Sequence, residues 1–422
     1  MPVYARLSLF VKNDSSHKFS YMSVRPSIST NTSARIATTA MFFVNGLGIG
    51  AWAVSIPGFK ARLALSNAEL SLTLLAMATG AVMSLPVAGL IGPLLGTGRS
   101  TRLSCAAFGI ALFLPAMTHH LGWLALAVFL VGATSGSLDV SMNAHATFVE
   151  KRWGMAIMSS FHAAYSAGGL AGAILGALLL TAGVDWSMLL PLVGGATLAT
   201  LLAMWTLFGI GEVTERTAKF AWPGLVALPL CIAALLCMMC EGAMNDWSSV
   251  YLSSVMASGH ALAAVGYASF SATMLMGRLV GDRVVRALSR ETVVRLGGAL
   301  AAVGLFMVGM APSPWWSIVG FALVGMGLSN VVPALFSESG NLGIPPATGI
   351  AMTATAGYSG FLMGPPLVGG VATLSGLRTS MFMLGAAAAT VAILASVMRP
   401  HRRSATTNIE VLTPVVKEPS GN

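Results

Sequence analysis

Long apolar runs separated by short polar breaks set the pattern along the whole chain. Most of the runs reach the roughly 20 mostly apolar residues that a helix needs to cross a bilayer. They lack the strict alternation of polar and apolar positions that is typical of membrane β-strands. We therefore predict twelve membrane-spanning helices, at residues 36–57, 69–95, 103–118, 122–148, 158–182, 187–210, 223–252, 261–281, 293–311, 315–338, 347–374 and 377–398.

The composition favours the same class of protein. Of the 422 residues, 55% are hydrophobic and only 9% are charged. Soluble domains usually carry about 25% charged residues. Because the backbone in lipid must satisfy its own hydrogen bonds, helices are the expected spanning elements. The sequence thus predicts an all-α membrane protein.

The distribution of basic residues predicts the topology. Loops on the cytoplasmic side of membrane proteins are enriched in Lys and Arg. With both termini inside, only Lys60, Arg62 and Arg378 of the 23 basic residues lie in outer loops, while Arg278 and Arg295 lie at span ends. We therefore predict a multi-pass membrane protein with both termini cytoplasmic. The net charge of +9 lies in short loops and tails, which gives no reason to expect nucleic acid as a partner.

The second half of the chain repeats features of the first half. One shift brings Tyr165-Ser166 onto Tyr358-Ser359, and the same shift brings Gly132 onto Gly325. A slightly longer shift brings Asn45-Gly46 onto Glu241-Gly242. Transporters with parallel repeats bind their solute near the midplane and rock one half against the other. We predict a disordered cytoplasmic tail at 1–35, six-helix halves at 36–210 and 223–398, a cytoplasmic linker at 211–222 and a cytoplasmic tail at 399–422.

Twelve spans in two pseudo-symmetric halves resemble the major facilitator superfamily, and the stretch GRLVGDRVVR at 277–286 resembles a loop motif of that family. The resemblance implies that Arg278, Asp282 and Arg283 form a gating latch on the cytoplasmic side. Asp282 stands one position later than in the common form of the motif. The matching first-half stretch, GLIGPLLGTGRSTR at 89–102, has no Asp, so the latch is expected in the second half alone.

A second stretch, SLDVSMNA at 137–144, is similar to the Leu-Glu-x-x-x-Asn stretch of the fucose–proton symporter branch of that family. The carboxylate of that stretch is the proton carrier there, which implies a proton-coupling role for Asp139 and the Asn role for Asn143. That branch also has an Asp in its first span, where this chain offers only Asn45. Together with EGAMNDW at 241–247, the stretch looks most like an uncharacterised bacterial branch of the superfamily.

Acidic residues inside the seventh apolar run are the strongest functional candidates that the residues themselves supply. A carboxylate at the centre of a membrane helix costs at least ~2.5–3.5 kcal/mol, and such groups usually face a cavity. Glu241 and Asn245 are four residues apart and share a helix face. We interpret Glu241 as a second proton-coupling residue, with a structural hydrogen-bond partner as the alternative. Asp246 fits a solute contact, an outer gate or a helix-end cap.

Two tryptophans complete the candidate solute site. Trp52 and Trp247 occupy near-equivalent places in the first and seventh spans, and such rings either stack on solutes or form interfacial belts. The four cysteines lie in apolar runs without a second pair of metal ligands, so no metal and no cofactor is expected. The predicted solute-binding residues are Asn45, Trp52, Asn143, Asn245, Asp246 and Trp247.

The leading functional prediction is a secondary transporter that imports a small polar solute together with protons by alternating access. The expected partners are the solute, protons and the lipid bilayer, with the protein acting as a monomer. The chain has no Gly-rich phosphate loop with a Lys, so it is expected not to be an enzyme. A drug or metabolite exporter working by proton antiport is the first alternative. A non-transporting membrane sensor is the second.

Overall fold

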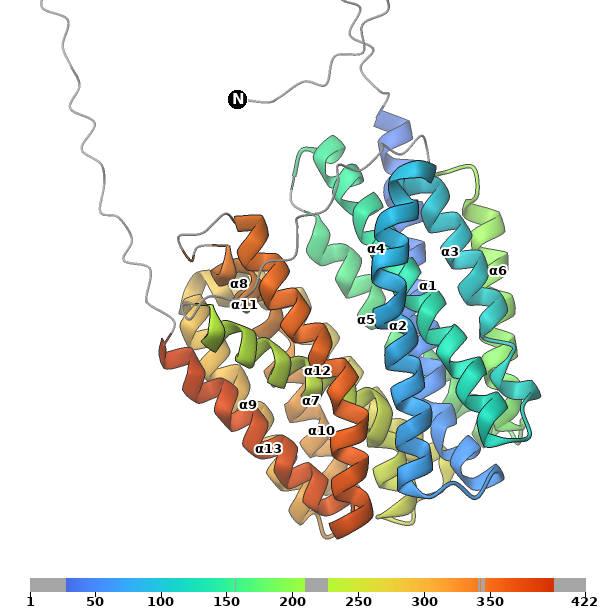
Figure 1. Ribbon diagram of the computed structural model, residues 1–422, viewed down its shortest axis with the longest axis vertical. Helices are drawn as coiled ribbons and strands as arrows, with labels where there is room; N and C mark the ends of the chain where they lie inside the picture. Colours follow the sequence, from blue (N-terminus) through green and yellow to red (C-terminus); the bar gives the residue numbers. More distant parts are fainter. Residues whose placement is uncertain (1–27, 156, 209–226, 341, 343–345, 398–422) are drawn as a thin grey trace, which may run out of the picture.

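The computed structural model describes residues 28–155, 157–208, 227–340, 342 and 346–397, and within these ranges the regular structure is helical (Figure 1). The first half contains α1 (Ile28–Arg62), α2 (Asn67–Leu95), α3 (Thr97–Ala111), η1 (Pro115–Met117), α4 (Leu121–Trp153), α5 (Met158–Thr181), η2 (Trp186–Met188) and α6 (Leu189–Met204). The second half contains α7 (Leu228–Ser254), α8 (His260–Leu288), α9 (Arg290–Met310), α10 (Pro314–Leu328), α11 (Val331–Ser339), α12 (Pro346–Ser375), α13 (Leu377–Leu394) and η3 (Ala395–Val397).

Local sequence signals fix the turns between these helices. At the start of α2, the Ser66 hydroxyl accepts a hydrogen bond from the Glu69 amide, and the Glu69 carboxylate accepts one from the Ser66 amide over 2.9 Å. This reciprocal capping box satisfies amides that the first helical turn leaves without partners. The chain therefore reverses sharply after α1 and sends α2 back along the bundle.

The predicted N-terminal tail is partly wrong, because α1 begins at Ile28 and residues 28–35 are helical. Packing explains the longer helix. Ala34 is buried, and the Arg35 guanidinium lies 4.6 Å from the ring centroid of Trp153 at the end of α4. The predictions for 1–27, for the linker at 211–222 and for the tail at 399–422 fall outside the described residues.

The tenth predicted span is interrupted rather than continuous. The helix stops between α10 and α11, because Pro333 has no amide proton to donate to the carbonyl of Ser329. Asn330, at the break, donates through its side-chain amide to the carbonyl of Gly277 in α8 over 2.9 Å. The break is thus stabilised by the neighbouring helix. With α10 and α11 taken as one span, the described chain has twelve membrane-length segments.

The outer surface of the bundle is apolar, as expected for a protein in lipid. Leu90, Leu94 and Leu374 are 75%, 83% and 87% exposed, respectively. Ten of the segments are long and apolar enough to cross a membrane. Among the described helices, α8 and α12 fall outside that set, and α8 carries several Arg residues, including Arg278.

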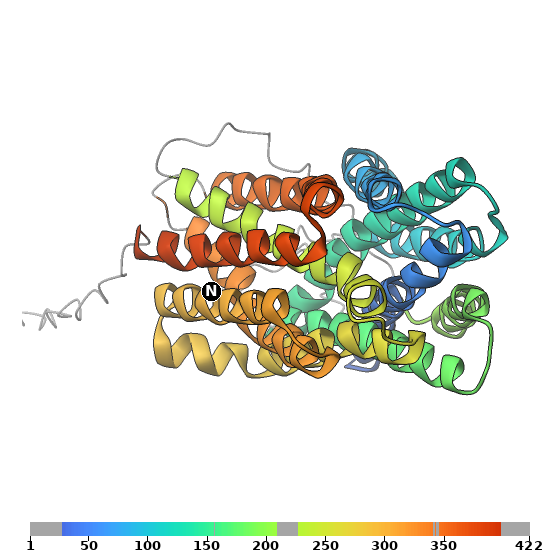
Figure 2. The same cartoon turned by 90° about the horizontal axis from the view of Figure 1, so that it is seen from below.

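The helices form two halves with the same internal packing (Figure 2). Helix α1 packs on α5 as α7 packs on α12, α2 packs on α4 as α8 packs on α10, and α3 packs on α6 as α9 packs on α13. The halves meet mainly through α2 with α12 and through α5 with α8. These two contacts are also exchanged by the repeat, which confirms the predicted fold of two pseudo-symmetric six-helix halves.

Glycines bring equivalent helix pairs into backbone contact. A side chain at Gly132 of α4 would overlap the carbonyl of Met77 in α2, and one at Gly325 of α10 would overlap the carbonyl of Phe270 in α8. The shift that relates Gly132 to Gly325 also relates Met77 to Phe270. The predicted pairing of Gly132 with Gly325 is therefore confirmed by the packing.

A second pair of glycines gives the register of α1 against α7. A side chain at Gly168 of α5 would overlap the carbonyl of Phe43, and one at Gly360 of α12 would overlap the carbonyl of Leu235. A single shift relates both contacts. That shift is one helical turn shorter than the one that the sequence suggested for these two spans.

Candidate functional site

A central cavity of about 200 Å³ lies between the two halves. Its walls come from α1, α2, α4 and α5 of the first half and from α7 and α12 of the second. Most of the wall is apolar, including Leu74, Met77 and Val82 of α2. Its polar and aromatic lining residues are Asn45, Trp52, Ser135, Asp139, Tyr165, Asn245, Asp246, Tyr358 and Phe361.

The structure brings together most of the residues that the sequence proposed for solute binding and proton coupling. Asn45, Trp52, Asp139, Asn245 and Asp246 all line this cavity, although they come from three helices and both halves. The sequence predicted Asp139 and the acidic pair of the seventh span on opposite sides of one site. For Asp246 the structure places the carboxylate there, and for Glu241 it does not.

Asp139 is held by a donor on each carboxylate oxygen. Asn143, one turn further along α4, donates to Oδ1 over 3.1 Å and to the Asp139 carbonyl over 2.9 Å. The Tyr358 hydroxyl, from the other half, donates to Oδ2 over 3.4 Å. Asn143 does not line the cavity. Its predicted solute contact is replaced by a positioning contact, because its side chain turns back onto Asp139.

Asp246 and Asn245 stand side by side on α7 and both line the cavity. Asp246 makes no hydrogen bond or ion pair with any residue in the part of the chain that the structure describes. A charged carboxylate without a partner in a low-dielectric environment is strongly disfavoured. The described site therefore lacks a positive charge beside Asp246, and a proton or a positively charged ligand would supply it.

Asn45 is 1% exposed, and its carboxamide oxygen accepts a hydrogen bond from the Ser135 hydroxyl over 3.0 Å. The sequence proposed that Asn45 is the repeat counterpart of Glu241. The packing register of α1 and α7 instead places Cys237 at the position equivalent to Asn45. Asn45 thus keeps its cavity position but loses its predicted relation to Glu241.

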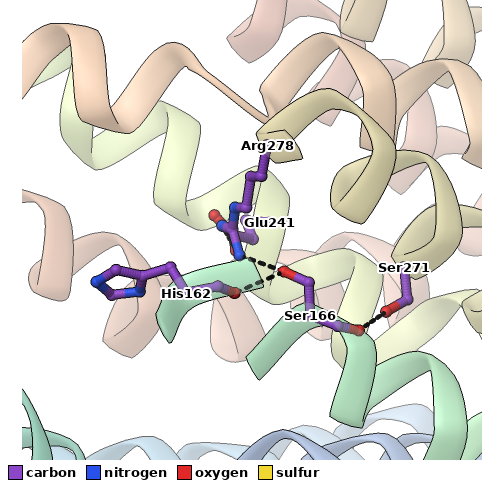
Figure 3. Close-up of polar contacts among 5 residues, drawn as sticks. All are labelled: His162, Ser166, Glu241, Ser271 and Arg278. Carbon is purple, nitrogen blue, oxygen red and sulfur yellow. Dashed lines mark hydrogen bonds and ion pairs between the residues drawn. The ribbon is translucent and has the colours of Figure 1, made fainter. Parts of the chain in front are cut away.

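Glu241 belongs to a separate polar network at the interface between the halves (Figure 3). Its Oε1 lies 3.2 Å from Nη2 of Arg278 in α8, and Nη1 of Arg278 donates to the Ser166 hydroxyl of α5 over 2.8 Å. The Ser271 hydroxyl donates to the Ser166 carbonyl over 3.3 Å. Arg278, which the loop motif assigned to the gating latch, therefore pairs with Glu241 inside the bundle.

His162 contributes its backbone rather than its ring to this network. Its carbonyl accepts from the Ser166 hydroxyl over 3.3 Å, while Figure 3 shows the imidazole turned away from Glu241 and Arg278. The ring instead meets Phe42 edge-on, with 5.3 Å between ring centroids. The network is thus carried by the Glu241–Arg278 pair and by Ser166.

The two tryptophans have different positions. Trp52 lines the cavity, whereas Trp247 is fully buried inside the second half and does not line it, so its predicted solute contact stays a prediction without support from this geometry. Neighbouring residues on a helix point about 100° apart. Because Asp246 faces the cavity, Trp247 is turned into the helix packing of its own half.

The remaining gating residues lie near the end of α8. Arg283 is exposed and forms none of the ion pairs found between described side chains. The side chain of Asp282 lies outside the described part of the structure. The predicted role of Asp282 and Arg283 therefore stays a prediction.

The sequence missed several polar residues of the site. Tyr165 and Tyr358 line the cavity, and Ser166 joins the halves. These residues stand in the two Tyr-Ser pairs that the repeat had matched, so the repeat itself was the available signal. Ser135 carried no such signal, because a lone Ser in an apolar helix usually bonds to its own backbone.

Comparisons with known proteins agree with the fold. The profile of the Major Facilitator Superfamily matches residues 38–342. An uncharacterised MFS-type transporter of Yersinia pestis is 36% identical over 375 residues, which cover 86% of this chain and 94% of the relative. Membrane protein MosC of Rhizobium meliloti is 32% identical over 385 residues, covering 89% of this chain and 93% of that protein.

Solved structures with the same arrangement of helices include the nucleoside transporter NupG. It has a TM-score of 0.66 at 14% identity, covering 88% of this chain and 99% of that one. A bacterial homologue of the human lysosomal transporter Spinster, in an inward-facing and unoccupied conformation, has a TM-score of 0.67 at 15% identity. That match covers 88% of this chain and 98% of the homologue. At such identities the likeness concerns the fold alone.

Proposed function

The chain belongs to the major facilitator superfamily, and we propose that it moves a small polar solute across the membrane by alternating access, coupled to protons. It is a multi-pass membrane transporter and not an enzyme. The observation that carries the proposal is the central cavity, to which each half contributes a carboxylate, Asp139 from α4 and Asp246 from α7.

Contacts between the halves support the alternating-access part of the proposal. Among them, Tyr358 bonds to Asp139 in the middle of the bundle, and Asn67 donates to the carbonyl of Ala372 over 3.4 Å at one end. That end is opposite the start of α1 (Figure 1). Rocking the halves would break these contacts and open the cavity toward that end.

Asp139 is the proposed proton carrier. Its two oxygens face donors from different halves, Asn143 on its own helix and Tyr358 across the cavity. Movement of the halves would remove the Tyr358 donor and change how strongly the carboxyl group holds a proton. The similarity of this stretch to the fucose–proton symporter branch supports the same role. Glu241, bound to Arg278 at the interface, would couple solute binding to the approach of the halves.

The direction of transport and the placement in the membrane complete the proposal. We infer import, with both termini in the cytoplasm of a bacterial cell and the protein in its inner membrane as a monomer. This orientation places the start of α1 and the end of α13 inside, which agrees with the distribution of basic residues. Proton antiport with export uses the same carboxylates and is the alternative that measurement must separate.

A proton-flux screen tests the function. Proteoliposomes containing a pH-sensitive dye receive concentration jumps of individual solutes from a polar library. We expect at least one solute to move protons with the parent protein and not with Asp139→Asn. The sign of the pH change separates symport from antiport. A solute that is transported without any proton movement would refute the coupling.

A further inference from the structure

We propose that the solute carries a protonated amine, and that Asp246 is the group that binds it. This inference rests on the proposed function of the central cavity as the solute site, and it adds the charge and shape of the solute. The charge balance of the cavity wall, the partners of each carboxylate and the aromatic surface of the cavity lead to it.

The wall of the cavity is acidic without compensation. It contains Asp139 and Asp246, and no Lys, Arg or His is among its lining residues in the described structure. The basic group on the adjacent face of α8, Arg278, is already paired with Glu241 at 3.2 Å. An anionic solute would therefore meet only like charge, while a cationic solute would meet the opposite charge.

The two carboxylates are not equally available. Asp139 already receives hydrogen bonds on both oxygens, from Asn143 and Tyr358. Asp246 receives none from the described residues, although it lines the same space. An ammonium group has three donors and a full positive charge, so it satisfies both the charge and the hydrogen-bonding capacity of Asp246.

Aromatic rings supply the rest of the environment that an organic cation needs. Trp52, Tyr165, Tyr358 and Phe361 all line the cavity. Ring faces attract cations, and the attraction is stronger where water is excluded than at exposed sites. The rings would also cover the apolar body of the amine, which a hydroxyl-rich solute would not need.

Two buried donors point to an acceptor elsewhere on the same solute. Trp52 is 2% exposed, and its indole N–H has no hydrogen-bond partner among the described residues. Asn45 is 1% exposed, and its one hydrogen bond in the described structure uses the carboxamide oxygen, which leaves the NH₂ group unused. Both residues line the cavity. A hydroxyl, ether or carbonyl oxygen on the solute would satisfy them.

The size of the cavity limits the solute. A volume of about 200 Å³ is small beside the roughly 300–1,000 Å³ of typical small-molecule pockets. The cavity therefore suits a small amine with a compact apolar body and an oxygen at the other end. A long polyamine, a peptide or a large drug would require a wider state of the protein.

Three matched probes test the inference on the purified full-length protein in detergent, by calorimetric titration. Tyramine, 4-(2-hydroxyethyl)phenol and 4-hydroxyphenylacetate share a phenol and differ in the charge of the side chain, which is positive, neutral or negative. We expect tyramine to bind at least tenfold more tightly than the other two. Asp246→Asn should remove this preference, and Asp246→Glu should keep part of it.

The control variant is Asp185→Asn, which removes an exposed carboxylate at the start of η2 that does not line the cavity. It should bind tyramine like the parent. Thermal unfolding checks that each variant is folded. The inference is overturned if the neutral or anionic probe binds as well as tyramine, if Asp246→Asn binds tyramine unchanged, or if tyramine does not bind the folded parent.

These outcomes are separable from the fate of the proposed function. If a neutral solute drives proton flux in the proteoliposome screen and tyramine does not bind, the transport function stands and the amine inference fails. If tyramine binds through Asp246 but no solute in the screen moves protons, the amine inference stands and proton coupling fails.

Discussion

The guanidinium of Arg278 donates a hydrogen bond of 2.8 Å to the hydroxyl of Ser166, and this bond joins α8 of one half to α5 of the other. The same guanidinium holds Glu241, whose neighbour Gly242 lines the central cavity. The solute site and the interface between the halves are therefore linked through one side chain. A change in the charge near Glu241 would therefore alter the hydrogen bond between Arg278 and Ser166 that joins the halves.

Ser166→Ala should weaken the contact between the halves. A hydrogen bond of this kind contributes about 1 kcal/mol, so we expect the ratio of the observed conformation to the alternative conformations to fall by about fivefold. Hydrogen exchange of the α5 and α8 amides measures this change. Ser160→Ala is the matched control, because among the described residues the Ser160 hydroxyl bonds only to the carbonyl of Ile157 at the start of its own helix. Equal exchange in both variants would contradict the role of Ser166.

Glu241→Gln should destabilise the protein because it leaves the Arg278 guanidinium without its counter-charge. Breaking a fully buried pair costs about 3–5 kcal/mol. These side chains are 16% and 18% exposed, so we expect a smaller loss of about 2 kcal/mol. Thermal unfolding of the single variants and of Glu241→Gln with Arg278→Gln measures the coupling. The double variant should recover part of the loss, and strictly additive effects would show that the pair is not coupled.

Asp139→Asn should abolish proton-driven accumulation of the transported solute while preserving exchange, because exchange requires no net proton movement. Counterflow and pH-gradient uptake in the same proteoliposomes separate the two activities. Tyr358→Phe should reduce accumulation less, because it removes one of the two donors to the carboxylate and keeps the carboxylate itself. Full accumulation by Asp139→Asn would assign the proton to another residue.

Reporter fusions test the orientation in the membrane. A reporter fused after residue 215 should give a cytoplasmic signal, and one fused after His120, which directly precedes α4, should give an external signal. The reason is the concentration of basic residues on the side of the N-terminus. The opposite pair of signals would invert the whole arrangement and place the contact between Asn67 and Ala372 on the cytoplasmic side.

Span positions and the cavity carboxylates could be predicted from the sequence because each depends on a local contrast. Polar breaks end apolar runs, and Asp139 or Asp246 inside such a run needs a cavity to be tolerated. The interruption between α10 and α11 was missed although Pro333 signals it, because Ser329 and Asn330 look like ordinary polar residues of a span. The structure shows that Asn330 donates to the Gly277 carbonyl of α8, whereas the Ser329 hydroxyl donates to the Met326 carbonyl of its own helix.

Partners across helices could not be predicted. Arg278 was assigned to a loop motif because it stands next to charged residues near the end of its span. Its actual partner, Glu241, lies on the preceding helix, and the depth at which the two meet depends on how α7 packs on α8. The register that the sequence predicted between α1 and α7 was wrong for the same reason. A Gly shared by two stretches of sequence is weaker evidence for their register than the backbone contacts made by Gly168 and Gly360.

The close approach of Gly132 to the Met77 carbonyl, repeated by Gly325 and Phe270, has a mechanical consequence. Two helices in backbone contact have no side chains between them that could reorient. Each such pair therefore moves as one rigid unit. Both halves contain the same stiff pair. Deformation should therefore concentrate at the interfaces between α2 and α12 and between α5 and α8. A displacement of either half at one face of the membrane should then be transmitted to the opposite face.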